Sequence, residues 1–174
     1  MINVFHNQDD FVLFGSDWID RLRETAKQSS LRRARLCLHR SDDDLVQEMM
    51  IALSRDCLFP PHRHPTKNES IHMIEGRVIM ILFNENGGPQ TSFLLAPPSQ
   101  HGLVAYRLCR SEFHTILPLD EVVIYHETTS GPFVPGEAVF AEWAPSDSAA
   151  LKAFLVDAAL KCGIPPSLLK STQY

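Results

Sequence analysis

The sequence lacks the features of membrane-spanning, secreted and zinc-knuckle proteins. None of its apolar runs approaches the roughly eighteen residues that a membrane span requires. The N-terminus has no basic segment followed by an apolar core, so no secretory signal is expected. The four cysteines are widely spaced and form no Cys-x-x-Cys pair, which argues against a structural zinc knuckle. We therefore expect a cytoplasmic protein with reduced thiols and no membrane partner.

Positive charge is also scarce. Sixteen lysines and arginines stand against 21 acidic residues, and the net charge is −5 with histidine neutral. A nucleic-acid partner is not expected, because phosphate contacts need a basic face. The hydrophobic content of 44% and the charged content of 21% are ordinary for a globular protein. A chain of 174 residues is predicted to be one domain with room for a substantial core.

Three regions can be distinguished along residues 1–174: an N-terminal extension over 1–45, a strand-rich centre over 46–142 and a C-terminal helical segment over 143–174. In the first region, Ser16 is predicted to cap a helix that runs to about Gln28 and packs one apolar face. In the last region, Ser146 is predicted to cap a helix over 147–161 that packs outside the strands, with a dimer contact as the alternative.

Residues 33–38 alternate in polarity and predict a half-buried strand. Ala34 and Leu36 face one way, and Arg33 and Arg35 face the other. The two arginines can be read as the solvated face of an edge strand, where charge discourages aggregation. They can also be read as ligands for an anionic substrate. The first reading is the one we expect.

The centre reads as several short strands separated by turn residues. Residues 46–53 fit either a short helix or a strand, whereas the runs that follow are rich in Val, Ile and Phe. The predicted strands cover residues 71–74, 77–83, 91–96, 103–108, 114–117 and 122–127. This spacing indicates a sandwich or a barrel, a mainly β fold.

The stretch HRHPTKNESIHMIEG carries the clearest chemical signal. His62 and His64 lie two residues apart, so on a strand both imidazoles point to the same face. Glu69 can return a carboxylate from a neighbouring strand after a short turn, and His114 is the candidate fourth ligand on a later strand. Imidazole and carboxylate together are typical of a site for one divalent transition metal ion, with Fe, Zn, Mn or Ni suited about equally.

This stretch resembles the first signature of the cupin superfamily, and the second signature is reduced here to its histidine, His114. More of the chain is similar to the WbuC family of cupin-fold metalloproteins, including Leu38-His39, the PPHRHP core, the FHT triplet and the late GPF and EWAP stretches. The resemblance implies a single cupin barrel, a double-stranded β-helix or jelly roll, with one bound metal and with helices packed outside. It favours the strand over 46–53 and implies a link to surface polysaccharide biosynthesis.

Two functions follow from this reading. The first is a metal-dependent enzyme acting on a small carbohydrate-like substrate, either an isomerase-type enzyme or an iron-dependent oxygenase. The alternative is a non-catalytic protein that binds a small ligand such as a sugar with the help of its metal. A metal-free epimerase of cupin shape is disfavoured because the ligand set is intact. A homodimer is expected from the resemblance.

Further candidates have weaker signals. Tyr106 and Tyr125 are candidate catalytic groups, and Glu127 and Lys67 are within reach of the same site. Cys57 is interpreted as a buried small hydrophobe rather than a functional thiol. His72 follows Glu69 by three residues. On a regular strand such residues point to opposite faces, so His72 should point away from Glu69. His126 can face either way, His101 is placed near the pocket mouth, and His39 has no assigned role.

Overall fold

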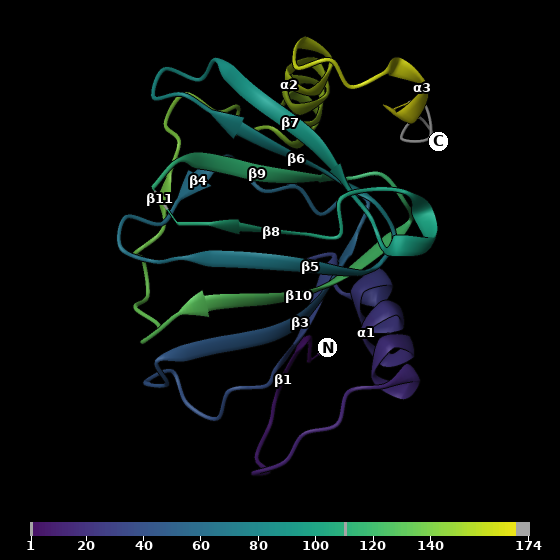
Figure 1. Cartoon of the computed structure of the whole chain (residues 1–174), viewed down its shortest axis with the longest axis vertical. Coiled ribbons are helices and arrows are strands. Elements are labelled where there is room, and N and C mark those ends of the chain that lie inside the picture. The colour runs from purple at the N-terminus through teal and green to yellow at the C-terminus, as the bar shows by residue number, and fades with distance from the viewer. Residues whose placement is uncertain (1, 110, 170–174) are drawn as a thin grey trace.

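In the computed structural model, which describes residues 2–109 and 111–169, the chain forms two β-sheets that pack face to face (Figure 1). The six strands of the larger sheet are, in spatial order, β1 (Val4–His6), β2 (Arg33–Cys37), β3 (Val46–Ser54), β10 (Val122–Ser130), β5 (Glu69–Glu75) and β8 (Ala105–Leu108). The five strands of the smaller sheet are β11 (Val139–Phe140), β4 (His62–Arg63), β9 (Phe113–Pro118), β6 (Val78–Phe83) and β7 (Pro89–Leu95). The predicted mainly β fold is confirmed.

Three helices and a short 3-10 turn complete the described part of the chain. They are α1 (Ser16–Gln28), α2 (Ser148–Lys161), α3 (Pro166–Leu169) and the turn η1 (Pro98–Gln100). Within residues 2–109 and 111–169, none of the helices has the length and apolarity to cross a membrane. The end of the predicted C-terminal segment, residues 170–174, lies outside the described residues.

The core between the sheets follows from the alternation along each strand. On β10, Val123 and Tyr125 point inward and meet Met73 of β5, while Val122 and Ile124 point outward beneath α1. The next inward position on β10 is Glu127, which therefore lies on the inner face of the larger sheet. A carboxylate at this register position faces the space between the two sheets.

The continuous apolar run of β6 reflects burial on both faces. Val78 and Met80 join the core between the sheets, whereas Ile79, Ile81 and Phe83 pack against α2. A strand covered on both sides has no solvent-facing position, and its sequence VIMILF has no polar alternation for that reason.

The two long helices cover opposite sheets from outside (Figure 1). Leu22 and Ala26 of α1 are fully buried against Leu36 of the larger sheet. Leu155 and Ala158 of α2 are buried against the smaller sheet. Both predicted helices and their packing outside the strands are confirmed.

The predicted caps of these helices are wrong by one residue each. Gly15 occupies the capping position of α1, and Ser16 is the first helical residue. Asp147 caps α2 instead of Ser146, since its carboxylate Oδ1 accepts a hydrogen bond of 2.8 Å from the backbone N–H of Ala150. A carboxylate satisfies a helix N-terminus as well as a hydroxyl does, and it adds a favourable charge.

Two other expectations are settled by the strand pairing. Residues 46–54 form strand β3, which excludes the helical alternative. The prediction that Arg33 and Arg35 lie on an edge strand is wrong, because β2 pairs with β3 on one side and in parallel with β1 on the other. The three-residue strand β1 is too short to leave a periodic signal in the sequence.

Candidate metal centre

Three imidazoles and one carboxylate meet at the inner face of the barrel. His62 lies on β4 and pairs in register with His114 of β9, and His64 follows β4 directly. Glu69 begins β5 and belongs to the opposite sheet, so the expectation that it sits on a strand neighbouring the histidines is wrong. The four candidate ligands therefore come from both sheets.

The four ligand atoms all lie within 4.8 Å of one another. His64 Nε2 is 3.3 Å from one carboxylate oxygen of Glu69, and His114 Nε2 is 3.6 Å from the other. With bonds of about 2.1 Å, two ligands on opposite sides of an ion lie about 4.2 Å apart. Small side-chain adjustments are therefore enough for all four groups to bind one ion.

Backbone carbonyls fix how two of the rings present their nitrogens. His62 Nδ1 lies 3.2 Å from the Pro60 carbonyl, and His114 Nδ1 lies 2.8 Å from the Glu112 carbonyl. A carbonyl only accepts, so each Nδ1 carries the proton and each Nε2 presents a lone pair to the centre. The buried Nε2 of His114 has no hydrogen-bond partner among the described residues. This orphaned acceptor fits a metal-binding role.

The electrostatics of the cluster favour an ionised Glu69 carboxylate and a neutral His62 ring. Burial raises the pKa of Glu69, but its close contacts with His114 and His64 and the hydrogen bond from Tyr106 outweigh this effect and hold that pKa well below its usual range. Burial lowers the pKa of His62 to about 4, with the neighbouring His114 acting in the same direction. Burial also lowers the pKa of His114, but its contact with Glu69 raises it above the ordinary value.

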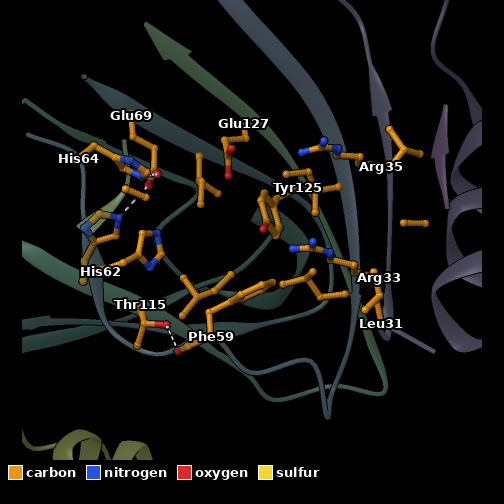
Figure 2. A pocket seen from close by; sticks show the side chains of 18 of the residues that line it. Leu31, Arg33, Arg35, Phe59, His62, His64, Glu69, Thr115, Tyr125 and Glu127 are labelled. Carbon is orange, nitrogen blue, oxygen red and sulfur yellow. Dashed lines mark hydrogen bonds and ion pairs between the residues drawn. The ribbon is translucent and has the colours of Figure 1, made fainter. Parts of the chain in front are cut away.

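The cluster opens into a cavity of about 380 Å³ between the two sheets (Figure 2). Phe59, Ile71 and Ile116 give this cavity apolar walls. Tyr125 and Glu127 face the cavity from β10, at positions beyond the cluster. Apolar walls with a few converging polar groups are typical of small-molecule sites.

Both tyrosines that the sequence singled out line this cavity. The Tyr106 hydroxyl donates a hydrogen bond to Glu69 Oε1, so it supports the cluster directly. Burial, together with the carboxylates of Glu69 and Glu127, raises the pKa of both Tyr106 and Tyr125 well above 10. These phenols are neutral donors over the physiological range.

Glu127 is the titratable group whose behaviour could not be read from the sequence. Burial and the nearby charge of Glu69 raise its pKa to about 8, and Arg35 acts in the opposite direction. At neutral pH it therefore holds a proton inside the cavity. The sequence signal that could have placed Glu127 in the cavity is its position in the alternation Val123-Tyr125-Glu127.

The interpretation of Arg33 and Arg35 as a solvated face is only partly right: Arg33 is exposed, but Arg35 is half-buried. Both line the cavity and point into it from β2, at the end away from His62 and Glu69 (Figure 2). Strand alternation identified their shared face correctly, but it does not say whether that face meets solvent or a cavity.

The weaker candidates fall outside the centre. Lys67 forms an ion pair of 3.0 Å with Glu137 and does not line the cavity. Cys57 is buried, its thiol donates to the Leu31 carbonyl at 3.4 Å, and burial raises its pKa to about 11, which agrees with the interpretation as a small core residue.

Four further histidines do not line the cavity: His39, His72, His101 and His126. His72 is exposed on the outer face of β5, as its spacing from Glu69 predicts, and pairs in register with His126. His126 lies 3.6 Å from a carboxylate oxygen of Glu48. His39 Nδ1 lies 3.1 Å from the Glu48 N–H, where it can accept a hydrogen bond and hold the end of β2 to β3. His101 adopts a positive φ of 54° after η1 and does not line the cavity, so its predicted place at the pocket mouth is wrong.

Comparison with known proteins establishes the fold. Residues 14–95, slightly less than half of the chain, match a family described as a domain of unknown function (DUF6016). No curated protein matches the sequence. A crystal structure of CapF with the inhibitor 3-isopropenyl-tropolone superposes with a TM-score of 0.51 at 16% identity, over 63% of this chain and 31% of that one.

Two further solved structures are similar to this chain to different degrees. The capsular polysaccharide assembling protein CapF from Staphylococcus aureus has a TM-score of 0.51 at 17% identity, over 63% of this chain and 31% of that chain. Oxalate decarboxylase from Bacillus subtilis has a TM-score of 0.44 at 14% identity, over 56% and 24% of the two chains, and is too distant to bear on this protein's chemistry. The chain thus spans about a third of the CapF length. The similarity to CapF and the two facing sheets show a single cupin barrel with flanking helices.

Proposed function

We propose that this cupin binds one divalent transition metal ion through His62, His64, Glu69 and His114. One observation carries the proposal: four ligand atoms from both sheets lie within 4.8 Å of one another, and the buried Nε2 of His114 has no other partner among the described residues. In addition, the carbonyls of Pro60 and Glu112 orient two imidazoles so that each can present its Nε2 to a metal ion. The resemblance of the sequence to the WbuC family supports the same site.

We propose that the site is catalytic and acts on a small carbohydrate-like substrate. When bound, a divalent ion polarises a carbonyl or hydroxyl oxygen, or lowers the pKa of a bound water. The chain supplies the rest: Phe59 and Ile116 exclude water, Tyr106 orients Glu69, and Glu127 holds a transferable proton facing the cavity. Its pKa of about 8 applies to the metal-free protein, and a bound cation would lower it.

This set of groups suits an isomerase-type reaction, in which one proton is moved on the substrate, or an iron-dependent oxygenase if iron is the ion. The link to surface polysaccharide biosynthesis is a proposal that rests on the WbuC resemblance. The name of CapF, a capsular polysaccharide assembling protein, is consistent with it. We also propose a cytoplasmic homodimer, and the four free cysteines are in keeping with a reducing compartment.

The second candidate is a non-catalytic, metal-dependent sugar-binding protein. A specific observation favours it: apart from the four cluster residues, Glu127 is the only described lining residue whose pKa is shifted to near neutrality. Moving a proton between two atoms usually needs an acid and a base. Tight ligand binding without turnover would distinguish this candidate from the enzyme.

Elemental analysis tests the metal site. Protein purified without added metal or chelator should contain close to one divalent ion per chain. The double variant His62→Ala/His64→Ala should contain none, while the matched variant His72→Ala, which removes an exposed imidazole from the outer face, should keep the ion. Metal-free wild type that stays empty after incubation with Fe²⁺, Mn²⁺, Zn²⁺ or Ni²⁺ would contradict the proposal. With occupancy shown, iron directs the search to oxygen uptake, and zinc, manganese or nickel directs it to isomerisation.

A further inference from the structure

Two arginines face the cavity opposite the metal cluster. Arg33 and Arg35 alternate on β2 and therefore share its inner face, and Figure 2 shows both guanidinium groups directed into the cavity toward Tyr125 and Glu127. His62, His64 and Glu69 lie at the other end of the same cavity. A ligand in the cavity would be in contact with both groups of residues.

Neither arginine is neutralised by the protein. Other arginines, such as Arg23 with Glu75 and Arg77 with Asp120, form two-point contacts with a carboxylate. Across the part of the chain that the structure describes, Arg33 and Arg35 form no ion pair, and the buried Nε–H of Arg35 has no acceptor. A buried donor without a partner is costly, and a ligand that accepts from it removes that cost.

The backbone of β2 at the two arginines is fixed by Asn3, and the guanidinium of Arg33 also contacts an aromatic ring. The backbone N–H of Arg35 donates to the Asn3 carbonyl at 2.9 Å, and the Asn3 side chain donates to the Arg33 carbonyl at 3.2 Å. The guanidinium of Arg33 lies 5.5 Å from the ring centre of Phe59, which supports it by a cation–aromatic contact. A strand backbone that is fixed on both sides keeps the two guanidinium groups on the same face of β2, and a planar guanidinium loses less entropy per hydrogen bond than a lysine does.

The local charge at this end is positive although the chain as a whole carries −5. Besides Glu69 of the cluster, Glu127 is the acidic side chain among the described residues that line the cavity. Even when it is ionised, Glu127 offsets only one of the two positive charges of Arg33 and Arg35. The cavity of about 380 Å³ is near the lower end of small-molecule sites, a size for one monosaccharide rather than a nucleotide sugar.

We infer that Arg33 and Arg35 form a subsite for the anionic group of a small, sugar-sized substrate, whose opposite end lies at the metal cluster. The shared chemistry is a set of charged oxygens, as in the carboxylate of a sugar acid or the phosphate of a sugar phosphate. Planar guanidinium groups bind such oxygens with two parallel hydrogen bonds. This inference rests on the proposed function, because the cluster end of the cavity is assumed to receive the uncharged end of the substrate.

Titration calorimetry on the metal-loaded protein tests the subsite with three probes: glucuronate, glucose 6-phosphate and glucose. At least one of the anionic probes should bind at least about tenfold more tightly than glucose, and the stronger one identifies the kind of anion. Arg35→Gln should weaken binding of that probe by about tenfold or more. The matched control is Arg55→Gln, since Arg55 also has a buried Nε without a partner but does not line the cavity. It should bind the probe as the wild type does.

Two additions keep the outcome clear. Arg33→Gln changes an exposed residue, so it serves as a second variant if Arg35→Gln does not fold. The same titration on His62→Ala/His64→Ala separates the two proposals, because the preference for the anionic probe should persist there while metal content is lost. Equal affinity for glucose and both anionic probes, no binding of either anionic probe, or an unchanged affinity in the variants that fold would overturn the subsite whatever the metal content.

Discussion

Glu69 is the residue through which the cavity is organised. Its carboxylate is 5% exposed and lies within ion-pair distance of His64 and His114, and it accepts a hydrogen bond from Tyr106. A buried carboxylate is stable only when its oxygens are satisfied, and this arrangement satisfies both. The same contacts keep it ionised and ready to bind a cation.

At the residue scale, we expect His114→Ala to weaken metal binding by at least about a hundredfold, because partners outside the ligand set already cost about 10–100-fold. His126→Ala is the matched control, since His126 points to Glu48 on the outer face. Metal titration followed by elemental analysis checks this. Full metal occupancy in a folded His114→Ala protein would show that the three remaining residues suffice.

Glu127 gives the protein a defined pH dependence. Its pKa is about 8 in the folded state, above the ordinary 4.5, so the folded protein binds more protons than the unfolded chain between these values. Stability from this residue is therefore fully present below about pH 4.5 and is lost as the pH rises to about 8. Glu127→Gln should be more stable than the wild type at pH 8, by on the order of 1–3 kcal/mol, and nearly equal to it near pH 5.

Urea unfolding of chelator-treated protein at several pH values measures this difference, since a bound cation would lower the pKa of a nearby carboxylate. Glu121→Gln, which removes an exposed carboxylate just before β10, should keep the wild-type pH profile. If Glu127→Gln also keeps that profile, the raised pKa is refuted.

At the scale of the elements, periodicity predicted the helices and strands well. An element that is covered on one face carries apolar residues on that face and polar residues on the other, and this pattern is visible in the sequence. The fully buried strand β6 was recognised from its Val, Ile and Phe content instead. The prediction that failed depended on a neighbouring strand. Because β1 was too short to predict, β2 was taken for an edge strand, and Arg33 and Arg35 were not expected to line a cavity. The His-x-His spacing survives such errors because i and i+2 share a face wherever the strand lies.

The cap of α2 gives a direct test at this scale. Asp147→Ala removes the carboxylate that accepts from the Ala150 N–H, and we expect a loss of about 1 kcal/mol in the free energy of unfolding. Ser146→Ala is the matched neighbour and should change stability by less than about 0.5 kcal/mol. Chemical denaturation measures both. A larger loss in Ser146→Ala than in Asp147→Ala would mean that the helix begins one residue earlier.

At the scale of the whole molecule, the cluster bridges the two sheets. His62 and His114 come from the smaller sheet, and Glu69 comes from the larger one. Because an ion bound here would bind the folded state and not the unfolded chain, it would stabilise the entire barrel. The sequence predicted which four side chains lie together, but not that the carboxylate comes from the facing sheet, since chain proximity does not reveal sheet membership.

Removing the metal should therefore lower the melting temperature. At a free metal concentration 100 times Kd the stabilisation is about 2.7 kcal/mol, which corresponds to roughly 5–10 °C for a domain of this size. A thermal melt with and without chelator measures the shift. The variant His62→Ala/His64→Ala should melt at one temperature in both conditions. If the chelator lowers the melting temperature of that variant by the same amount, its effect does not come from a metal at this cluster.

The most direct test of the metal site is an anomalous difference map from crystals of the wild-type protein, collected at the absorption edge of the metal found by elemental analysis. The account predicts one peak per chain, within bonding distance of the Nε2 atoms of His62, His64 and His114 and of the Glu69 carboxylate. A peak at any other position, or none after the protein has been incubated with divalent metal, would contradict it.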